Sequence, residues 1–305
     1  MSRPNSPSEF RLEALRACLE AMARRLDPEA VKRLDPIGVV HRYEDPNDRE
    51  VMALIASAVA FGRVQSIRRS LEKIADALGP WPAQFIEMSD EKELLERFHP
   101  IVHRIYRGAD LARLLLAARD LRRIHGSLAQ AIERFAQTPL GEAWALSHPL
   151  ASRPRLLALL VRLGDALRAH LPASRPSLHL VPSVRHGSTC KRLLLFLRWM
   201  CRPADGIDLG LARFPLSELV IPMDTHVHRF ARALGLTSSK SPSMRAAVEV
   251  SDALRLIDEK DPVRFDAVLC HLGFTQPCPL APRHDPCQRC PLRRACAVWM
   301  GHEKS

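Results

Sequence analysis

The fold is decided by residues 187–201, which have the sequence GSTCKRLLLFLRWMC. The apolar run is almost unbroken, and this predicts a helix that is buried on every side. Ser188 is the expected N-cap, which places Lys191 in the first helical turn. There the positive end of the helix dipole and the desolvating core both disfavour the ammonium form of a lysine. The stretch therefore predicts a nucleophilic amine at Lys191, although a lysine beside a buried helix can also simply reach solvent.

A second informative stretch is residues 222–235, PMDTHVHRFARALG. Asp224 is expected to cap a helix that ends at Gly235. The apolar residues between these two positions recur at helical spacing. An aspartate in this place can be a helix cap alone, or it can cap the helix and also act on a substrate.

Four cysteines near the end of the sequence have the spacing C-x8-C-x2-C-x5-C, and they are Cys278, Cys287, Cys290 and Cys296. Four thiolates on a short loop can hold a 4Fe-4S cluster or a tetrahedral zinc ion. Zinc sites more often pair two C-x2-C motifs, and this segment has one, so the spacing favours the cluster. Zinc and free thiols remain as alternatives.

The charge balance of the chain points to a polyanionic partner. Among 305 residues the net charge is +11, with 47% apolar residues. Such a balance suits nucleic acid, although a solvated basic surface would give it as well. No apolar stretch is long enough to span a bilayer, and no hydrophobic signal segment follows the first residues. We therefore expect a cytoplasmic, nucleoid-associated protein without a membrane partner, in which the cysteines are free or metal-bound.

Helical patterns joined by Pro, Gly and Ser fill most of the remaining chain, and no alternating strand signal interrupts them. Asn47 and Glu50 are expected to form a capping box, and residues 172–182 a linker. The sequence therefore predicts an all-α protein. The expected helices span residues 8–26, 48–61, 65–78, 90–97, 110–123, 127–135, 155–171, 244–257 and 262–272.

These segments resemble the helix-hairpin-helix DNA glycosylase superfamily, in its endonuclease III-like, iron-sulfur cluster type. Residues 223–227, MDTHV, look like the Val-Asp-Thr-His segment of that family, and Lys191 resembles its catalytic lysine. The last three cysteines match the cluster-binding loop, while the first gap is two residues longer. Residues 53–58 resemble the first core helix of the family's barrel domain. The glutamine that follows in the family is replaced here by Val59, which we expect in the core.

The resemblance implies a two-lobed, all-α fold from a divergent bacterial branch of the superfamily. One lobe, residues 45–200, would be a helical barrel domain with a modified helix-hairpin-helix. The other would join residues 1–44 to 201–305 and carry the iron-sulfur cluster loop, 278–296. The implied activity is that of a monomeric base-excision DNA glycosylase with AP lyase activity, acting on a flipped damaged or modified base in double-stranded DNA. Lys191 and Asp224 would be its catalytic residues.

The same resemblance implies which residues contact DNA. In the family, a glycine-rich hairpin donates backbone N–H groups to a phosphate. Here the hairpin is altered, with Gly187 as its one glycine and with Arg185 and His186 to supply charge. Arg229, Arg293 and Arg294 are also expected to contact phosphates. The alternatives are a non-catalytic DNA- or RNA-binding protein on the same scaffold and a zinc-stabilised helical interaction protein.

Overall fold

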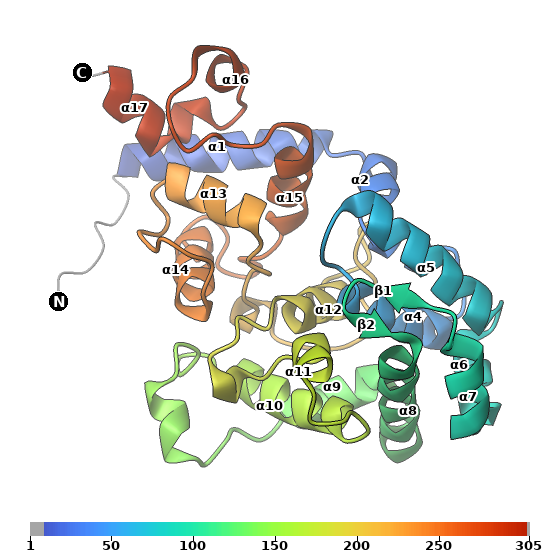
Figure 1. Cartoon of the computed structure of the whole chain (residues 1–305). Coiled ribbons are helices and arrows are strands. Elements are labelled where there is room, and N and C mark those ends of the chain that lie inside the picture. Colours follow the sequence, from blue (N-terminus) through green and yellow to red (C-terminus); the bar gives the residue numbers. More distant parts are fainter. Residues whose placement is uncertain (1–8, 304–305) are drawn as a thin grey trace. The chain divides into compact units, whose positions relative to one another are not determined.

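The computed structural model describes residues 9–303 and is mostly helical (Figure 1). Within these residues the chain forms seventeen α-helices, four short 3-10 helices and one two-stranded hairpin. The prediction of an all-α protein is thereby confirmed. Among the described residues, no helix combines the length and the apolar character needed to cross a bilayer.

The chain divides into two compact units. The central unit is Pro28–Pro215, and the terminal unit combines the residues up to Asp27 with those from Leu216 onward. The lobe boundaries expected near residues 45 and 200 come from the resemblance to the glycosylase family. They stay a prediction, because the two compact units do not test a glycosylase fold.

The central unit holds most of the helices. They are α2 (Pro28–Leu34), α3 (Ile37–Val40), α4 (Pro46–Ala58), α5 (Val64–Leu78), α6 (Pro82–Met88), α7 (Glu91–Phe98), α8 (Gly108–His125), α9 (Leu128–Ala136), α10 (Pro154–Arg168), α11 (Arg175–Leu180) and α12 (Lys191–Cys201). Strands β1 (Val102–His103) and β2 (Tyr106–Arg107) form the antiparallel hairpin, and η1 (Ala143–Ser147) and η2 (Val184–His186) are 3-10 helices.

Helix α12 is the buried centre of this unit, as its sequence predicts. Every residue of α12 after Lys191 is buried, and the helix packs on α4, which is buried from Glu50 to Ala58. Val59, where the resembling family has a glutamine, is fully buried in the core, as expected. Removing a large side chain here, as in Phe196→Ala, costs about 3–5 kcal/mol in such well-packed cores.

The start of α4 corrects a prediction. Asp45, not Asn47, is the N-cap, and its Oδ1 accepts a hydrogen bond from the Asn47 N–H at 2.7 Å. Pro46 fixes the first helical position, because its φ already suits a helix and it has no N–H to satisfy. Glu50 does not close a capping box. It pairs with Arg122 and accepts from the backbone N–H of Ala129 at 3.0 Å, which ties α4 to α8 and α9.

Two other segments differ from the sequence predictions. Residues 172–182 are not a plain linker, because they contain α11, whose N-cap Ser174 accepts from the Ser177 N–H. The hairpin of β1 and β2 was also unexpected. Each of these elements is too short to show a periodic pattern, and that explains both errors.

The terminal unit contains the remaining helices. They are α1 (Glu9–Arg25), α13 (Thr225–Ala233), α14 (Met244–Arg255), α15 (Asp266–Thr275), α16 (His284–Gln288) and α17 (Ala297–Glu303), with the 3-10 helices η3 (Leu216–Glu218) and η4 (Arg293–Ala295). Helix α1 packs on α15 and η4, and α13 packs on α15 and α17. Arg264 joins distant parts of this unit, since it pairs with Glu20 of α1 and lies 4.1 Å from the ring centroid of Phe265.

Candidate functional site

Lys191 is the first residue of α12, but the helix begins differently from the prediction. The N-cap is Cys190, in the left-handed conformation (φ 46°, ψ 30°), and it gives no side-chain cap. Ser188 is therefore not the N-cap; its Oγ accepts from the Cys190 N–H at 3.1 Å. A left-handed non-glycine residue costs roughly 1–2 kcal/mol. Packing holds it, because the Cys190 side chain is fully buried and its thiol donates to the Pro182 carbonyl at 3.6 Å.

Lys191 lines a cavity of about 470 Å³ in the central unit, which we call the Lys191 cavity. This volume is in the range of small-ligand sites. None of its lining residues, all of them in the described chain, is acidic. The side chains that decide its chemistry are Phe61, His179, His186, Thr189, Lys191 and Arg192.

Arg192 is the most unusual residue that lines the Lys191 cavity, and it was not among the predicted site residues. It is only 8% exposed. Its Nη1 donates to the Tyr106 hydroxyl at 2.6 Å, and its Nη2 donates to the His179 carbonyl. The guanidinium lies 5.3 Å from the ring centroid of Phe61. Burial lowers the pKa of Arg192, and the nearby Tyr106 and Cys190 oppose that shift.

Aromatic rings surround the Arg192 head group. Phe61 lies 5.1 Å from Tyr106 and 4.9 Å from His179, measured between ring centroids. Burial raises the pKa of Tyr106 to about 12, although Arg192 acts against it, so this residue is a neutral phenol near neutral pH. Burial also lowers the pKa of His179, and the positive charges of Arg192 and Arg104 add to the effect.

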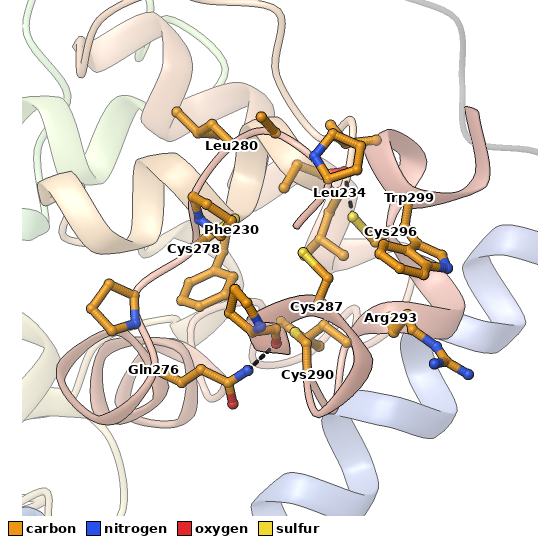
Figure 2. A pocket seen from close by; sticks show the side chains of 18 residues that line it. Phe230, Leu234, Gln276, Cys278, Leu280, Cys287, Cys290, Arg293, Cys296 and Trp299 are labelled. Carbon is orange, nitrogen blue, oxygen red and sulfur yellow. Dashed lines mark hydrogen bonds between the residues drawn. The ribbon is translucent and has the colours of Figure 1, made fainter. Parts of the chain in front are cut away.

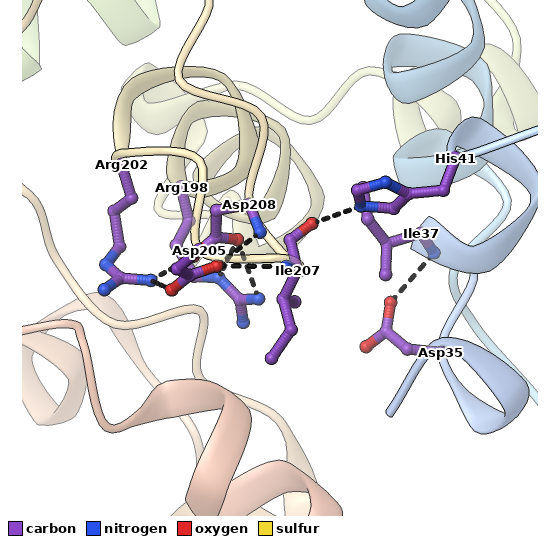
Figure 3. A network of polar contacts seen from close by, with 8 residues as sticks. All are labelled: Asp35, Ile37, His41, Arg198, Arg202, Asp205, Ile207 and Asp208. Atoms are coloured by element: carbon purple, nitrogen blue, oxygen red, sulfur yellow. Dashed lines mark hydrogen bonds and ion pairs between the residues drawn. The ribbon is translucent and has the colours of Figure 1, made fainter. Parts of the chain in front are cut away.

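The C-terminal end of α12 carries a second buried polar group, shown in Figure 3. Nε and Nη2 of Arg198 donate to Oδ1 of Asp208 at 3.1 and 3.0 Å, and Arg202 pairs with Oδ2 of the same carboxylate. Asp205 closes a turn, since its Oδ1 accepts from the Ile207 and Asp208 N–H groups. Buried arginines at this end of the helix are thus paired with carboxylates.

Asp35 lies close enough to Lys191 for their charges to interact, and no local sequence pattern predicts this proximity. Burial raises the pKa of Asp35, while the charges of Arg198 and Lys191 oppose that rise. Its Oδ1 accepts from the Ile37 N–H at 3.0 Å (Figure 3). Asp35 therefore provides a carboxyl group near Lys191 within the same unit.

The residues of the altered hairpin that were predicted to contact phosphate lie in different surroundings. His186 lines the Lys191 cavity, whereas Arg185 does not. Arg185 pairs with Glu142 at 2.5 and 2.8 Å and lies 5.0 Å from the ring centroid of Trp144. Hydrogen bonds from Arg185 and Trp144 lower the pKa of Glu142 to about 2. Gly187 is exposed, with a φ of +72° that favours glycine.

Asp224 is the N-cap of α13, as predicted, and Gly235 follows the helix with a φ of +70°. Asp224 Oδ1 accepts from the Val227 N–H at 2.7 Å, and the Cys270 thiol lies 3.8 Å from Oδ2. The neighbouring His226 packs against Phe274. Asp224 belongs to the terminal unit, and Lys191 to the central one.

All four cysteines of the predicted metal site line one small cavity of about 40 Å³, the cysteine cavity (Figure 2). Its other walls include Phe230, Arg293 and Trp299. Burial raises the pKa of the Cys278 and Cys290 thiols, that of Cys290 to about 11, and the neighbouring thiols add to the shift.

The chemistry of this cavity fits a thiophilic metal. Neighbouring thiols disfavour one another's ionisation, because the resulting thiolates repel. A bound cation would reverse that effect. Within residues 9–303, no group of three or more His, Cys, Asp or Glu side chains already stands in a metal-holding arrangement. Four thiols suit an iron-sulfur cluster and zinc alike.

The predicted phosphate-contacting arginines of the terminal unit lie near the cysteine cavity or at the surface. Arg293 lines the cavity, 5.8 Å from the ring centroid of Trp299. Arg294 and Arg229 are exposed. The charge of Arg229 reaches the Cys278 thiol, whose pKa it acts to lower. These positions suit phosphate contacts and equally suit solvation.

Comparison with known proteins identifies the family of the chain. No curated protein is similar enough to count as a match. The family described as "Protein of unknown function (DUF2400)" matches residues 35–275. The matched region includes Lys191, Arg192 and Asp224 and ends before the four cysteines. Because the match covers most of the sequence, the chain belongs to the DUF2400 family.

Proposed function

We propose that this protein is a base-excision DNA glycosylase with AP lyase activity, built on the helix-hairpin-helix scaffold and acting on double-stranded DNA. The observation that carries the proposal is the place of Lys191. It begins a buried helix, at the end where the helix dipole is positive, and it lines a cavity without acidic residues. Such a cavity attracts a polyanion and places an amine within it.

The proposed reaction begins when the target nucleotide leaves the base stack, since its sugar carbon cannot be reached inside the duplex. The Lys191 amine attacks C1′, the bond from C1′ to the base breaks, and the departing base takes up a proton. The C1′–O4′ bond then opens and leaves a Schiff base between Lys191 and C1′. Loss of a C2′ proton expels the 3′ phosphate and cuts the strand. The Asp224 carboxylate would stabilise the positive charge that develops on the sugar and assist proton transfer.

The cysteine cavity would hold a structural 4Fe-4S cluster. Zinc is the alternative metal that the same thiolates could bind. Its ligands would be Cys278, Cys287, Cys290 and Cys296. The metal would stabilise the fold of this segment and present the basic side chains of Arg293 and Arg294 to the DNA backbone. A nucleoid-associated location would follow from such binding.

Borohydride trapping tests the proposal. Incubation with duplexes carrying damaged bases, or an abasic site, should give a covalent protein–DNA adduct after reduction of the Schiff base. Lys191→Ala should abolish the adduct while DNA affinity stays within a few-fold. Lys73→Ala is the matched control, because Lys73 is an exposed lysine of the same unit, and its adduct should form normally.

Asp224→Asn separates a catalytic carboxylate from a simple cap. Asn caps a helix about as well as Asp, so α13 should persist. Base removal should fall strongly, and trapping on an abasic site should fall less, because the base has already gone. Intact DNA binding without base removal or trapping, across the whole substrate panel, would contradict the enzyme and favour a non-catalytic DNA- or RNA-binding protein.

A further inference from the structure

We propose that the Lys191 cavity is a phosphate-binding site in which the Arg192 guanidinium makes the central contact. The ligand class is a phosphate group of a nucleotide, either a phosphodiester within a strand or a phosphomonoester. The inference deepens the proposed function and rests on it only for the polynucleotide nature of the substrate. It does not require glycosylase chemistry.

The first observation is a contrast within α12. Arg198 is buried and pairs with the buried Asp208. Arg192 is also buried, yet among residues 9–303 it has no carboxylate partner; its hydrogen-bond partners are the Tyr106 hydroxyl and His179. Buried charges in proteins are usually paired, since desolvation is costly. The missing anion at Arg192 is therefore expected to come from a ligand.

The second observation is that Arg192 faces a space in which a ligand can sit. It lines the Lys191 cavity together with the amine of Lys191 and the ring of His186. The hydroxyl side chains of Ser183, Ser188 and Thr189 line it as well. All of these groups can donate hydrogen bonds to an oxyanion.

Further positive charges lie close to the lining residues of the Lys191 cavity. The guanidinium of Arg104 lies 5.3 Å from the Phe61 ring centroid, the same distance as that of Arg192. The positive charge of Arg175 also reaches His179. With no acidic lining residue, the cavity offers positive potential that nothing inside it cancels. A dianionic phosphate would be stabilised there more than a neutral group.

The start of α12 adds backbone donors to the same wall. The first N–H groups of a helix have no partner within the helix, and the N-cap Cys190 provides no side-chain acceptor. Helix N-termini bind phosphate through such groups. The number of donors at the cavity, from Arg192, Lys191, the hydroxyls and the start of α12, favours a tetrahedral phosphate over a carboxylate, which has fewer oxygens to accept hydrogen bonds.

The test uses the full-length protein in phosphate-free buffer. Binding of inorganic phosphate, thymidine 5′-monophosphate, thymidine and a duplex oligonucleotide is measured by titration calorimetry. Phosphate and the monophosphate should bind, while thymidine should not. Arg192→Met should weaken phosphate binding by about tenfold or more, because hydrogen bonds to charged groups are the strong ones. The phosphate affinity of Arg192→Lys should lie between those of the wild type and Arg192→Met, since lysine keeps the charge and loses the planar guanidinium.

Stability gives a second readout that holds even when binding is weak. Arg192→Met should unfold at an unchanged or higher temperature than the wild type in phosphate-free buffer, because it removes an unpaired buried charge. Arg198→Met, the matched control on the same helix, should unfold at a lower temperature, because it leaves Asp208 with one arginine fewer. Added phosphate should raise the melting temperature of the wild type and leave that of Arg192→Met unchanged.

The outcomes separate the possible sources and the two proposals. Tight binding of the monophosphate assigns the site to a phosphomonoester, and an Arg192 effect on the duplex alone assigns it to a phosphodiester. Phosphate binding without borohydride trapping keeps the site and removes the glycosylase. Trapping in which Arg192→Met changes neither phosphate nor duplex binding overturns the inference, as does a benzoate that binds where phosphate does not.

Discussion

The Lys191 cavity and the cysteine cavity concentrate chemistry in opposite ways. The first is formed by residues far apart in the sequence, such as Phe61, His179 and Lys191, and is anchored on a buried helix. The second is formed mainly by one short segment of the chain, in which Cys287 lies on the short helix α16 and the other three cysteines lie outside helices. Packing therefore shapes one site, and the spacing of donors along the chain shapes the other.

This difference has a consequence for stability. Most charges around α12 are satisfied inside the protein, as the pairs between Arg198, Arg202 and Asp208 show. In the cysteine cavity, burial and then the neighbouring thiols instead raise the pKa of Cys278 and Cys290. The central unit should therefore be stable through its own contacts, whereas the cysteine segment should depend on a bound metal.

The largest expected effect is at the cysteine cavity. Protein purified without oxygen should contain iron and acid-labile sulfide in equal amounts, and Cys287→Ser should lose both and destabilise the terminal unit by several kcal/mol, since metal binding is coupled to folding. Iron and sulfide analysis with urea denaturation measures this. Cys18→Ser is the control, because Cys18 lies in the same unit and does not line the cavity. Finding one zinc ion per chain and no iron would contradict the iron-sulfur cluster and identify the metal as zinc.

The next effect should appear at the buried ion pairs. Asp208→Asn removes the carboxylate that Arg198 and Arg202 share, so the free energy of unfolding should fall by about 3–5 kcal/mol, as is usual when one partner of a buried pair is lost. Asp205→Asn should cost less, because its side chain is 39% exposed. Equal losses in urea denaturation would show that the Asp208 network does not stabilise the central unit in the way described.

A pH effect should follow at Tyr106, whose hydroxyl accepts from Arg192 of the Lys191 cavity. The fold raises the pKa of Tyr106 to about 12, so the neutral phenol is favoured in the folded state. Its contribution to stability is full below the unfolded value of about 10 and is lost as pH rises towards 12. By pH 11 the loss should be roughly 1 kcal/mol. Urea midpoints at pH 9 and pH 11 measure it, and Tyr106→Phe should show a flatter dependence.

The smallest effect concerns the surface charges. Glu142→Gln should release Arg185 from its ion pair and free it for DNA phosphates. The slope of log affinity against log salt should then steepen by about one unit, with a small gain in affinity. Fluorescence anisotropy over a salt series measures both. The opposite change, a flatter slope, is expected for Arg293→Ala with Arg294→Ala, and an unchanged slope in both variants would place the DNA surface elsewhere.

Sequence reasoning found the parts of these sites that local patterns determine. The apolar run of α12, the Asp224 cap and the Gly235 stop depend on neighbouring residues, and all three are present. The four cysteines line one cavity, because residues so close along the chain cannot separate far, and the metal site predicted from their spacing stays a prediction. The identity of the metal does not follow from spacing, since both candidates use thiolates.

What the sequence could not predict depends on long-range packing. Ser188 is a better N-cap by residue type than Cys190, but burial of the Cys190 thiol against Pro182 sets the helix start. Arg192 looks like one charge in an apolar run. Its role becomes visible only when Tyr106 and His179, from distant parts of the sequence, close around it. The available signal was the charge itself, inside a helix that is otherwise apolar.

The left-handed Cys190 also determines the chemoselectivity of the cavity. A thiol and an amine are adjacent in the sequence at Cys190 and Lys191, and in water the thiol would be the faster nucleophile. Burial raises the pKa of the Cys190 thiol to about 12 and covers its sulfur completely, so it should resist alkylating reagents at neutral pH. Iodoacetamide should thus spare this wall, and a carbonyl reagent with a reductant should label Lys191. An electrophilic probe for this site should therefore carry an amine-selective group.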